Sequence, residues 1–341
     1  MDIHTNIPLK NYTTMKLGGN ARFIADVRTP EDVPMLYKNA TSRSLPVAIL
    51  GGGSNTIVRD ERYDGIVLRM RIPGITVVND DLYSTTLQVG AGETWDDVVK
   101  YAVDNRLGGI EAMSAIPGTA GAAPVQNVGA YGQEIADTLI SLEAYDTTED
   151  KFITLDNAAC HFSYRNSIFR DEEKGRYIIT SITLKLSKNL PTPPFYEGLQ
   201  RYLDEHSITT YTHQVIRDAV TAIRKDKLPN PVERPNTGSF FKNAIIESWQ
   251  LPDIQAIEPD VPFYDMGDGR YKIPTGWLIE KSGLKGSLLH GMRVHDKNAL
   301  VLINESATSY GDLAEARDEI VTAVRDKFRI EIVQEPLELY S

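Results

Sequence analysis

The sequence predicts an α+β protein of two or three domains. Its 341 residues exceed the usual length of a single domain. Short apolar runs ending in glycine alternate with amphipathic helical patterns. The segment Leu228-Pro229-Asn230-Pro231 follows a predicted helix, and two prolines so close together interrupt regular structure. We therefore place a domain boundary there.

The first two thirds of the chain carry several predicted elements. Strands are expected at residues 45–50, 65–70, 87–89, 141–145 and 177–186, and helices at 93–106 and 215–225. The first helix should bury one face, made of Trp95, Val98, Val99, Ala102 and Val103.

The last third has its own pattern. We expect a helix over residues 275–282, a strand over 299–303 and a helix over 312–328. The inward face of the last helix should be Leu313, Ala316, Ile320, Ala323 and Phe328. The C-terminal tail, residues 330–341, should be extended and lie along an edge because it contains Pro336.

Composition excludes several classes of protein. A formal net charge of −11 argues against wrapping nucleic acid, so any anionic ligand needs a local concentration of basic groups. The single cysteine, Cys160, excludes an internal disulfide and a cysteine metal cluster, and fits a reducing cytoplasm. The N-terminus lacks an apolar signal core, and no run approaches the roughly 20 apolar residues of a membrane helix. We expect a cytoplasmic protein with no metal and no membrane contact, and a monomer.

Two glycine-rich segments have the character of phosphate-binding loops. Residues 51–55 (GGGSN) follow a predicted strand, and their backbone N–H groups could form a nest for phosphate oxygens. A tight turn without a ligand is an equally open reading of this loop. Residues 107–132 are almost uncharged and rich in Gly and Ala, which permits the close backbone approach that a pyrophosphate needs. A packed core loop is the alternative. Neither segment is a Rossmann fingerprint or a P-loop.

Three later segments carry ionisable groups. Arg165, in residues 163–169 (SYRNSIF), could recognise a carboxylate with its planar guanidinium, or form a structural ion pair. Residues 224–229 (RKDKLP) and 236–243 (NTGSFFKN) supply the local basic charge that an anion requires, and Ser239 follows a glycine there. A serine would need help to donate a proton, for example from Lys227. A charged helix end beside a buried aromatic pair is the alternative. Tail glutamates could act as an acid near a cofactor, or lie exposed on an edge strand.

Residues 13–19 (TTMKLGG), 51–55 and 116–132 (IPGTAGAAPVQNVGAYG) together resemble the FAD-binding half of the UDP-N-acetylenolpyruvoylglucosamine reductase (MurB) family, and the likeness extends over essentially the whole chain. The resemblance implies a vanillyl-alcohol-oxidase/MurB-like FAD-binding fold of two α+β subdomains, with a C-terminal α+β substrate-binding domain. It places the first subdomain at 1–70, the second at 71–228, joined by residues 327–341, and the substrate domain at 229–326. Non-covalent FAD would be bound by Gly51, Gly52, Gly53, Ser54, Asn55, Ile116, Pro117, Gly118, Thr119, Gly121, Ala122, Gln126, Asn127, Gly129, Ala130, Tyr131 and Gly132.

The resemblance also implies a catalytic set of Arg165, Ser239 and Glu335, with Glu335 preferred to Glu338 because it precedes a proline. NADPH would be the co-substrate, and the enolpyruvyl ether of UDP-N-acetylglucosamine would be reduced to UDP-N-acetylmuramate for peptidoglycan synthesis. Tyr196 is similar to the tyrosine that closes over substrate in the longer-loop type of the family. Further substrate contacts are expected at Lys227, Asn243, Tyr264, Lys285 and Asn298.

Two other functions are compatible with parts of this pattern. One is a different flavoenzyme on the same fold, such as a sugar or alcohol oxidase. The other is a nucleotide-binding protein without catalysis, which would require a degenerate catalytic set. The GSFFKN and KLP motifs argue against the first, and intact Arg165 and Ser239 argue against the second.

Overall fold

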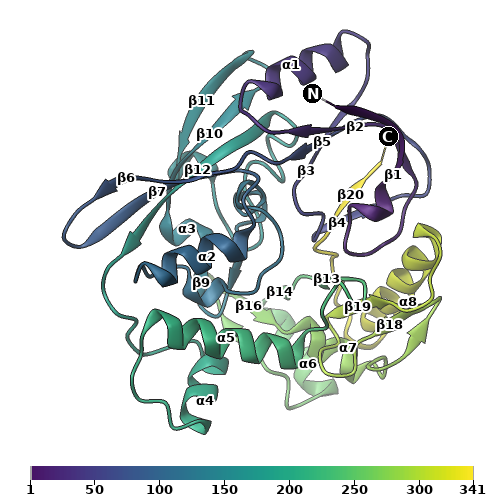
Figure 1. Ribbon diagram of the computed structural model, residues 1–341. Helices are drawn as coiled ribbons and strands as arrows, with labels where there is room; N and C mark the ends of the chain where they lie inside the picture. The colour runs from purple at the N-terminus through teal and green to yellow at the C-terminus, as the bar shows by residue number, and fades with distance from the viewer. Residues whose placement is uncertain (1, 341) are drawn as a thin grey trace.

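The computed structural model describes residues 2–340, which form three bodies around the middle of the molecule (Figure 1). The first body is a four-stranded sheet in the order β1-β2-β5-β3, with α1 on one side. Strands β2, β5 and β3 are parallel, and β1 pairs antiparallel with β2. The elements are β1 (Ile3–Pro8), β2 (Asn20–Val27), α1 (Asp32–Thr41), β3 (Val47–Leu50), β4 (Thr56–Val58) and β5 (Tyr63–Met70).

The second body is a five-stranded antiparallel sheet in the order β11-β10-β12-β7-β6. Helix α2 packs on it through Trp95, Val98, Val99, Ala102 and Val103, all buried, which confirms the predicted face. The elements are β6 (Ile75–Asp80), β7 (Ser84–Gly90), α2 (Trp95–Asp104), β8 (Gly129–Ala130), β9 (Gln133–Glu134), α3 (Ile135–Thr138), β10 (Leu139–Asp146), β11 (Lys151–Asp156) and β12 (Tyr177–Ser187).

The two sheets share apolar contacts. Tyr145 from β10 and Ile178 from β12 are buried in the same cluster as Leu68 from β5 and Leu36 from α1. This shared core fixes the first two bodies against each other, because buried side chains are packed too densely to slide.

Helices α4 (Glu197–Glu205) and α5 (His213–Lys227) cross below the second body (Figure 1). The Thr212 hydroxyl accepts a hydrogen bond from the Val215 amide at 3.2 Å and caps α5. The helix therefore begins two residues before the predicted start and ends two residues after the predicted end, at Lys227, with Leu228 between it and the first proline. Ile216, Val220 and Ile223 bury its inner face together with Ala112.

The third body contains the four-stranded sheet β13-β19-β18-β17 and the three-stranded sheet β14-β16-β15. Its long helix, α8, begins with a reciprocal capping box between Ser309 and Asp312. The elements are β13 (Asn236–Ser239), β14 (Ala244–Glu247), α6 (Leu251–Ile257), β15 (Tyr264–Asp265), β16 (Arg270–Ile273), α7 (Thr275–Lys281), β17 (Leu288–Leu289), β18 (Met292–Val294), β19 (Val301–Asn304) and α8 (Tyr310–Phe328).

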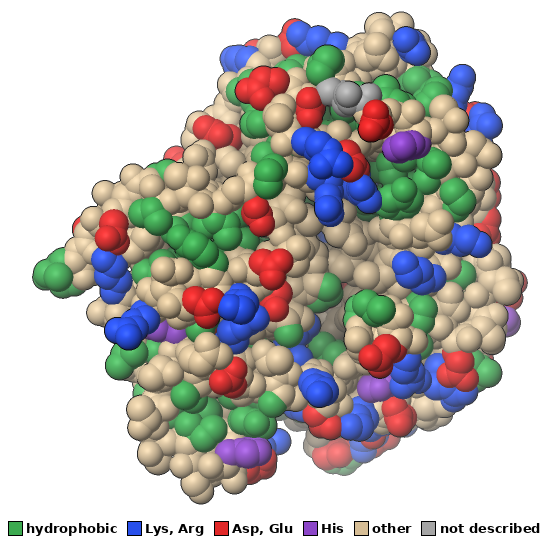
Figure 2. All heavy atoms as spheres, in the orientation of Figure 1, with side chains coloured by type: hydrophobic (Ala, Val, Ile, Leu, Met, Phe, Trp, Pro, Cys, Tyr) green, Lys and Arg blue, Asp and Glu red, His purple; other side chains and the backbone are tan. Residues whose placement is uncertain are grey.

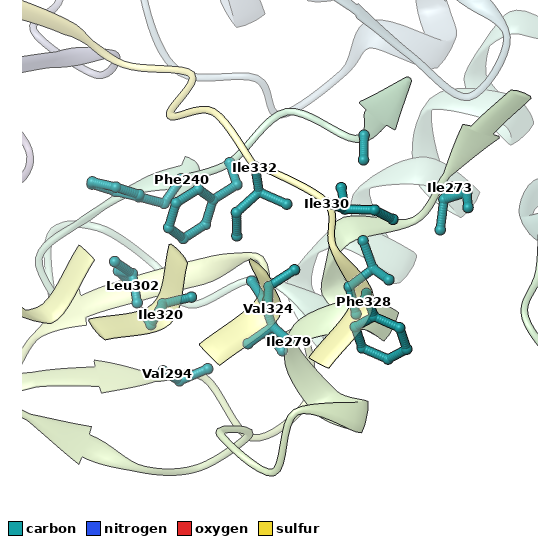
Figure 3. Packing of buried hydrophobic residues seen from close by; sticks show 14 of the residues in the cluster. Phe240, Ile273, Ile279, Val294, Leu302, Ile320, Val324, Phe328, Ile330 and Ile332 are labelled. Carbon is teal, nitrogen blue, oxygen red and sulfur yellow. The ribbon is translucent and has the colours of Figure 1, made fainter. Parts of the chain in front are cut away.

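The inward face of α8 differs from the prediction at one position. Val324 is fully buried, whereas Ala323 is only half-buried. Val324 and Phe328 follow Ile320 at intervals of four, which keeps them on one side of the helix. Figure 3 shows these three side chains pointing into the same core.

The C-terminal tail contacts more than the second body. Ile330 and Ile332 pack in the core of the third body beside Phe240 (Figure 3). Farther on, β20 (Leu337–Leu339) pairs parallel with β4, and Leu339 enters the core of the first body. The strand pairing ties the third body to the first, and contacts of Arg165 and Arg170 with Glu335 also join the tail to residues 71–228. The tail is extended, as predicted, and the domain boundaries stay a prediction.

No helix within residues 2–340 is long and apolar enough to cross a membrane. Within the same residues, no group of three or more His, Cys, Asp or Glu is arranged to hold a metal ion.

Candidate active site

All three bodies contribute to one large cavity of about 520 Å³, a usual size for a ligand site. Figure 2 shows this face of the molecule hollowed near its centre, between the bodies. The wall includes both glycine-rich segments, Arg165, Ser239 and the tail from residue 337 to 340 with Glu335. The structure therefore brings together, at one cavity, the loops and the catalytic residues that the sequence predicts separately.

The first glycine loop follows β3 and needs its glycines. Gly53 has φ +67°, and a Cβ there would lie 2.0 Å from the Tyr12 carbonyl oxygen. A Cβ on Gly52 would lie 3.0 Å from the Gly118 Cα, so the two loops meet backbone to backbone. The Ser54 hydroxyl donates to the Pro117 carbonyl at 3.1 Å. The loop is therefore clamped against the second segment across the cavity wall.

Two buried hydroxyls on this wall have no hydrogen-bond partner within residues 2–340. They are Thr119 Oγ1 in the second segment and Thr237 Oγ1 in β13. Buried polar groups are nearly always paired, so these two hydroxyls mark places on the wall where the described residues leave hydrogen bonding incomplete.

Glu335 lies at the point where the three bodies meet. Its carboxylate Oε1 is 3.4 Å from Arg165 Nε, and its side chain is only 12% exposed. Burial raises the pKa of Glu335, and the positive charges of Arg165, Arg170 and Lys242 oppose that shift. The structure thus favours a protonated carboxyl more than an exposed glutamate would.

Arg165 is held by backbone carbonyls rather than by a tight ion pair. Nη2 donates to the Gly129 carbonyl at 2.7 Å, and Nη1 to the Asn127 carbonyl at 3.4 Å. Arg165 has φ +54°, an uncommon backbone conformation for a residue with a side chain. These contacts aim the guanidinium at the cavity and leave it in reach of Glu335.

The carboxylate of Glu338, unlike that of Glu335, is engaged in several hydrogen bonds with neighbouring side chains. It accepts hydrogen bonds from Arg59 at 2.7 Å, from Arg317 at 2.9 Å and from the Tyr310 hydroxyl at 2.8 Å. Burial would raise the pKa of Glu338, but these bonds to Arg59 and Tyr310 bring it below its usual value. Its carboxylate is saturated by structural contacts, which supports the choice of Glu335 as the acid at the cavity.

Ser239 ends β13 on a tight turn. Gly238 has φ +70°, and its amide donates to the Asn236 side-chain oxygen at 2.7 Å. Behind the turn, Phe240 and Phe241 are buried with ring centroids 5.1 Å apart. The turn therefore holds Ser239 on the cavity wall. The expected helper, Lys227, is exposed, and no hydrogen bond joins it to Ser239 among the described residues.

Some predicted cofactor residues do not line the cavity. Asn127, Ala130, Tyr131 and Gly132 lie off its wall. Asn127 is buried, and its amide group donates to the Ser163 carbonyl at 3.2 Å and accepts from the Ala136 amide at 3.1 Å. Its side chain is occupied in holding the second segment to the Arg165 segment.

Among the predicted substrate residues, Tyr196, Tyr264 and Asn243 gather near Tyr164. Partial burial and the nearby phenols of Tyr264 and Tyr164 raise the pKa of Tyr196. Asn243 hydrogen-bonds Tyr164, and the Lys272 ammonium lies 5.4 Å from the ring centre of Tyr164 and 5.5 Å from that of Tyr264. This aromatic and cationic group adjoins Arg165, whose guanidinium is 5.3 Å from the Tyr164 ring centre.

The other predicted substrate residues are placed elsewhere. Lys285 pairs with Glu280 at 2.9 Å. The Asn298 side chain accepts from the Leu300 amide at 3.2 Å and so shapes the turn before β19. The structure does not bring Lys227, Lys285 or Asn298 into contact with the tyrosine group.

Several basic side chains near the cavity are not among the site residues predicted from sequence. Arg170 and Lys242 surround Glu335, and Lys272 lies between two tyrosines. Arg224 lines the cavity, where burial lowers its pKa, and its Nε donates only weakly, to the Ala115 carbonyl at 3.3 Å. Arg170, Arg224 and Lys242 lie in or next to segments that the sequence marks, but spacing does not reveal which basic side chains turn inward.

The two glycine loops meet on the wall of one cavity, where their backbone amides suit the phosphates of a nucleotide cofactor. Residues 21–155 match the model of an FAD binding domain, and residues 230–338 match the C-terminal domain of UDP-N-acetylenolpyruvoylglucosamine reductase. The reductase of that name from Ralstonia nicotianae is 40% identical over 97% of both chains, and that from Flavobacterium johnsoniae is 37% identical over 98% of this chain and 99% of its own. The crystal structure of the reductase from Thermus caldophilus covers 100% of both chains with a TM-score of 0.67 at 24% identity, which shows a shared fold.

The chain belongs to the UDP-N-acetylenolpyruvoylglucosamine reductase family. The predicted FAD-binding fold with a separate C-terminal domain is confirmed.

Proposed function

We propose that this protein uses FAD and NADPH to reduce the enolpyruvyl ether of UDP-N-acetylglucosamine, giving UDP-N-acetylmuramate for peptidoglycan synthesis. The observation that carries the proposal is a single cavity in which two glycine loops face Arg165, Ser239 and Glu335. A cofactor site and an acid–base set share one space, as a reduction with proton transfer requires.

The residues present fit FAD. The backbone amides of the loops can receive a pyrophosphate, the glycines at 51–53 and 118 allow its close approach, and the unpartnered Thr119 hydroxyl lies behind the same wall. The cavity wall in residues 2–340 contains neither His nor Cys, which favours non-covalent binding. Cys160 is buried elsewhere, and burial raises its pKa to about 12. Bound FAD would take a hydride from NADPH and supply it to the terminal carbon of the enolpyruvyl double bond.

Arg165 and Glu335 would stabilise the charge that this reduction creates. Addition at the terminal carbon pushes an electron pair onto the substrate carboxylate, which becomes an enediolate. A guanidinium fixed by two backbone carbonyls can bind that group without reorganising. Glu335 in its protonated form can donate a hydrogen bond to the same oxygens, and its raised pKa supports that role.

Ser239 would complete the reaction by donating a proton to the carbon that bears the carboxylate. The enediolate then collapses to a carboxylate, and the double bond becomes a single bond with one added hydride and one added proton. The serine alkoxide regains its proton from solvent or from a neighbouring acid. The turn at Gly238 supports this assignment because it fixes the hydroxyl at the cavity.

The substrate's diphosphate and uridine are proposed to extend toward Tyr196, Asn243 and Tyr264, with Tyr196 closing over them. Lys272 supplies positive charge within this group. Lys227, Lys285 and Asn298 are kept as further proposed contacts, and they would have to be reached by the far end of the ligand or by loop closure.

The test is NADPH consumption by FAD-loaded protein, measured with and without the enolpyruvyl sugar nucleotide. We expect rapid consumption only with substrate, and one UDP-N-acetylmuramate formed per NADPH, detected by mass spectrometry. A sugar or alcohol oxidase would instead consume oxygen with a saturated sugar or alcohol as donor. Flavin binding without turnover of the enolpyruvyl substrate would contradict the proposal.

A further inference from the structure

Arg170 lies between the second glycine segment and the C-terminal tail. Its Nη1 donates to Gln126 Oε1 at 3.1 Å, and its Nη2 donates to the backbone carbonyl of Glu335 at 2.7 Å. Gln126 Oε1 also accepts a hydrogen bond from Asn55 Nδ2 in the first glycine loop. One guanidinium thus links both proposed FAD loops to the residue proposed as the acid.

This guanidinium has no carboxylate at ion-pair distance within residues 2–340, although much of it is buried. Its desolvation lowers the pKa of Arg170, and the nearby charge of Glu335 opposes that effect. A buried cation without a close counter-ion costs stability. Its two hydrogen bonds to neutral oxygens are directional, so their main effect is on geometry.

The backbone of Glu335 is fixed from both sides. Its amide donates to the Phe240 carbonyl at 2.8 Å, directly after Ser239, and its carbonyl accepts from Arg170. The first bond sets Glu335 relative to the serine turn. The second sets it relative to the cofactor loops.

We propose that Arg170 is a positioning residue. Through Gln126 and Asn55, it fixes the position of the Glu335 carboxyl relative to the proposed flavin loops. The inference rests on the proposed function, because it concerns the acid of that reaction. Arg170 itself does not need to touch the substrate.

The charges around Glu335 predict how the pH dependence of the reaction changes when Arg170 is replaced. The groups that face its carboxyl are Arg165, Arg170, Lys242 and the phenol of Tyr164, while Glu338, three residues farther along the tail, is engaged by Arg59 and Arg317. Removing the Arg170 charge takes away one of three cations that favour the carboxylate. The pKa of Glu335 must then rise further, and a rate that needs the protonated form persists to higher pH.

The experiment compares Arg170→Met, Arg170→Lys and the surface control Arg28→Met, whose parent side chain is 72% exposed. Each holoenzyme is reduced by NADPH without oxygen and then mixed with the enolpyruvyl sugar nucleotide, so the two half-reactions are timed separately across pH. Flavin content and the NADPH half-reaction report on folding and cofactor binding.

We expect Arg170→Met to slow the substrate half-reaction by about 10²-fold, the usual effect of misplacing a catalytic group by about 1 Å. The NADPH half-reaction and the KM for substrate should stay near wild type, and the alkaline limb of the substrate half-reaction should move to higher pH. Arg170→Lys keeps the charge, but a lysine cannot reach both oxygens. Its substrate half-reaction should therefore be slower than in the wild type, while the alkaline pH at which the rate falls should stay the same. Arg28→Met should match wild type.

The inference is overturned if the wild type reacts with substrate and Arg170→Met reacts equally fast. It is also overturned if both half-reactions of Arg170→Met are slower and the alkaline decline of the substrate half-reaction stays at the wild-type pH. If Arg170→Met does not fold, Arg170→Lys decides, since an unchanged substrate half-reaction in that variant also overturns it. A wild type that oxidises NADPH but never reduces substrate would overturn the proposed function itself, and the positioning role with it.

Discussion

Replacing Glu338 by glutamine should weaken the fold while leaving the chemistry intact. The carboxylate of Glu338 ties the tail to α8 through Arg317 at 2.9 Å and Tyr310 at 2.8 Å, and its side chain is 12% exposed. The matched variant is Glu335→Gln, three residues earlier on the same tail. It should leave the stability of the fold unchanged and remove most of the activity.

The magnitude follows from the bond to Arg317, whose side chain is 21% exposed. Losing a hydrogen bond between charged, largely buried partners costs about 1.5–3 kcal/mol. The contact with Arg59 is open to solvent, so we count nothing for it. The tail stays in place in Glu338→Gln because backbone bonds hold it, from Leu337 to the Asn55 carbonyl at 3.0 Å and from Arg59 to the Leu339 carbonyl at 3.2 Å. Glu335 therefore keeps its position.

Urea unfolding of the two holoproteins, followed by circular dichroism and flavin fluorescence, measures the stability change. Turnover with NADPH and the enolpyruvyl substrate measures the chemistry. We expect Glu338→Gln to lose about 1.5–3 kcal/mol and keep its kcat, and Glu335→Gln to keep its stability and lose most of its kcat. If Glu338→Gln abolished turnover at full stability while Glu335→Gln remained active, the roles assigned to the two glutamates would be reversed.

Three other predictions concern the same cavity. Ser239→Ala should accept electrons from NADPH at the wild-type rate but reduce substrate about 10²- to 10⁴-fold more slowly, the usual loss for a general acid, and full turnover would remove the proton-donor role. The pKa of the Glu335 carboxyl is higher in the folded than in the unfolded protein, so its protonation stabilises the fold at pH values below the unfolded pKa. This stabilisation is lost as the pH rises through the folded pKa. The substrate half-reaction should decline over the same interval, and a Glu335→Gln variant that kept both pH dependences would contradict this. Gly53→Ala should yield protein poor in FAD, since its Cβ would lie 2.0 Å from the Tyr12 carbonyl oxygen; normal flavin content would show that the loop tolerates the strain.

The elements with a clear apolar period could be predicted from sequence. Helix α2 buries the expected five residues, and α8 departs from the prediction only at Val324. Strands β1 and β6 lacked such a signal because exposed residues dominate them. The pairing of β20 with β4 joins segments far apart in the chain, and such partners leave no local pattern to read.

The candidate site shows a similar division. Glycine loops are visible in sequence because close backbone contact restricts the residue type, as at Gly52 and Gly53. The choice between Glu335 and Glu338 could not be made from residues alone, since both are acids in the same short tail segment. Only their surroundings differ: Arg59, Arg317 and Tyr310 saturate Glu338, whereas burial raises the pKa of Glu335.

The most direct test of the account uses reduced enzyme and one substrate. FAD-loaded protein is bleached with one equivalent of NADPH in the absence of oxygen, then mixed with the enolpyruvyl ether of UDP-N-acetylglucosamine. The account predicts that the yellow flavin absorbance returns as an equal amount of UDP-N-acetylmuramate forms. Flavin that stays bleached with this substrate, and regains its colour only when oxygen is admitted, would contradict it.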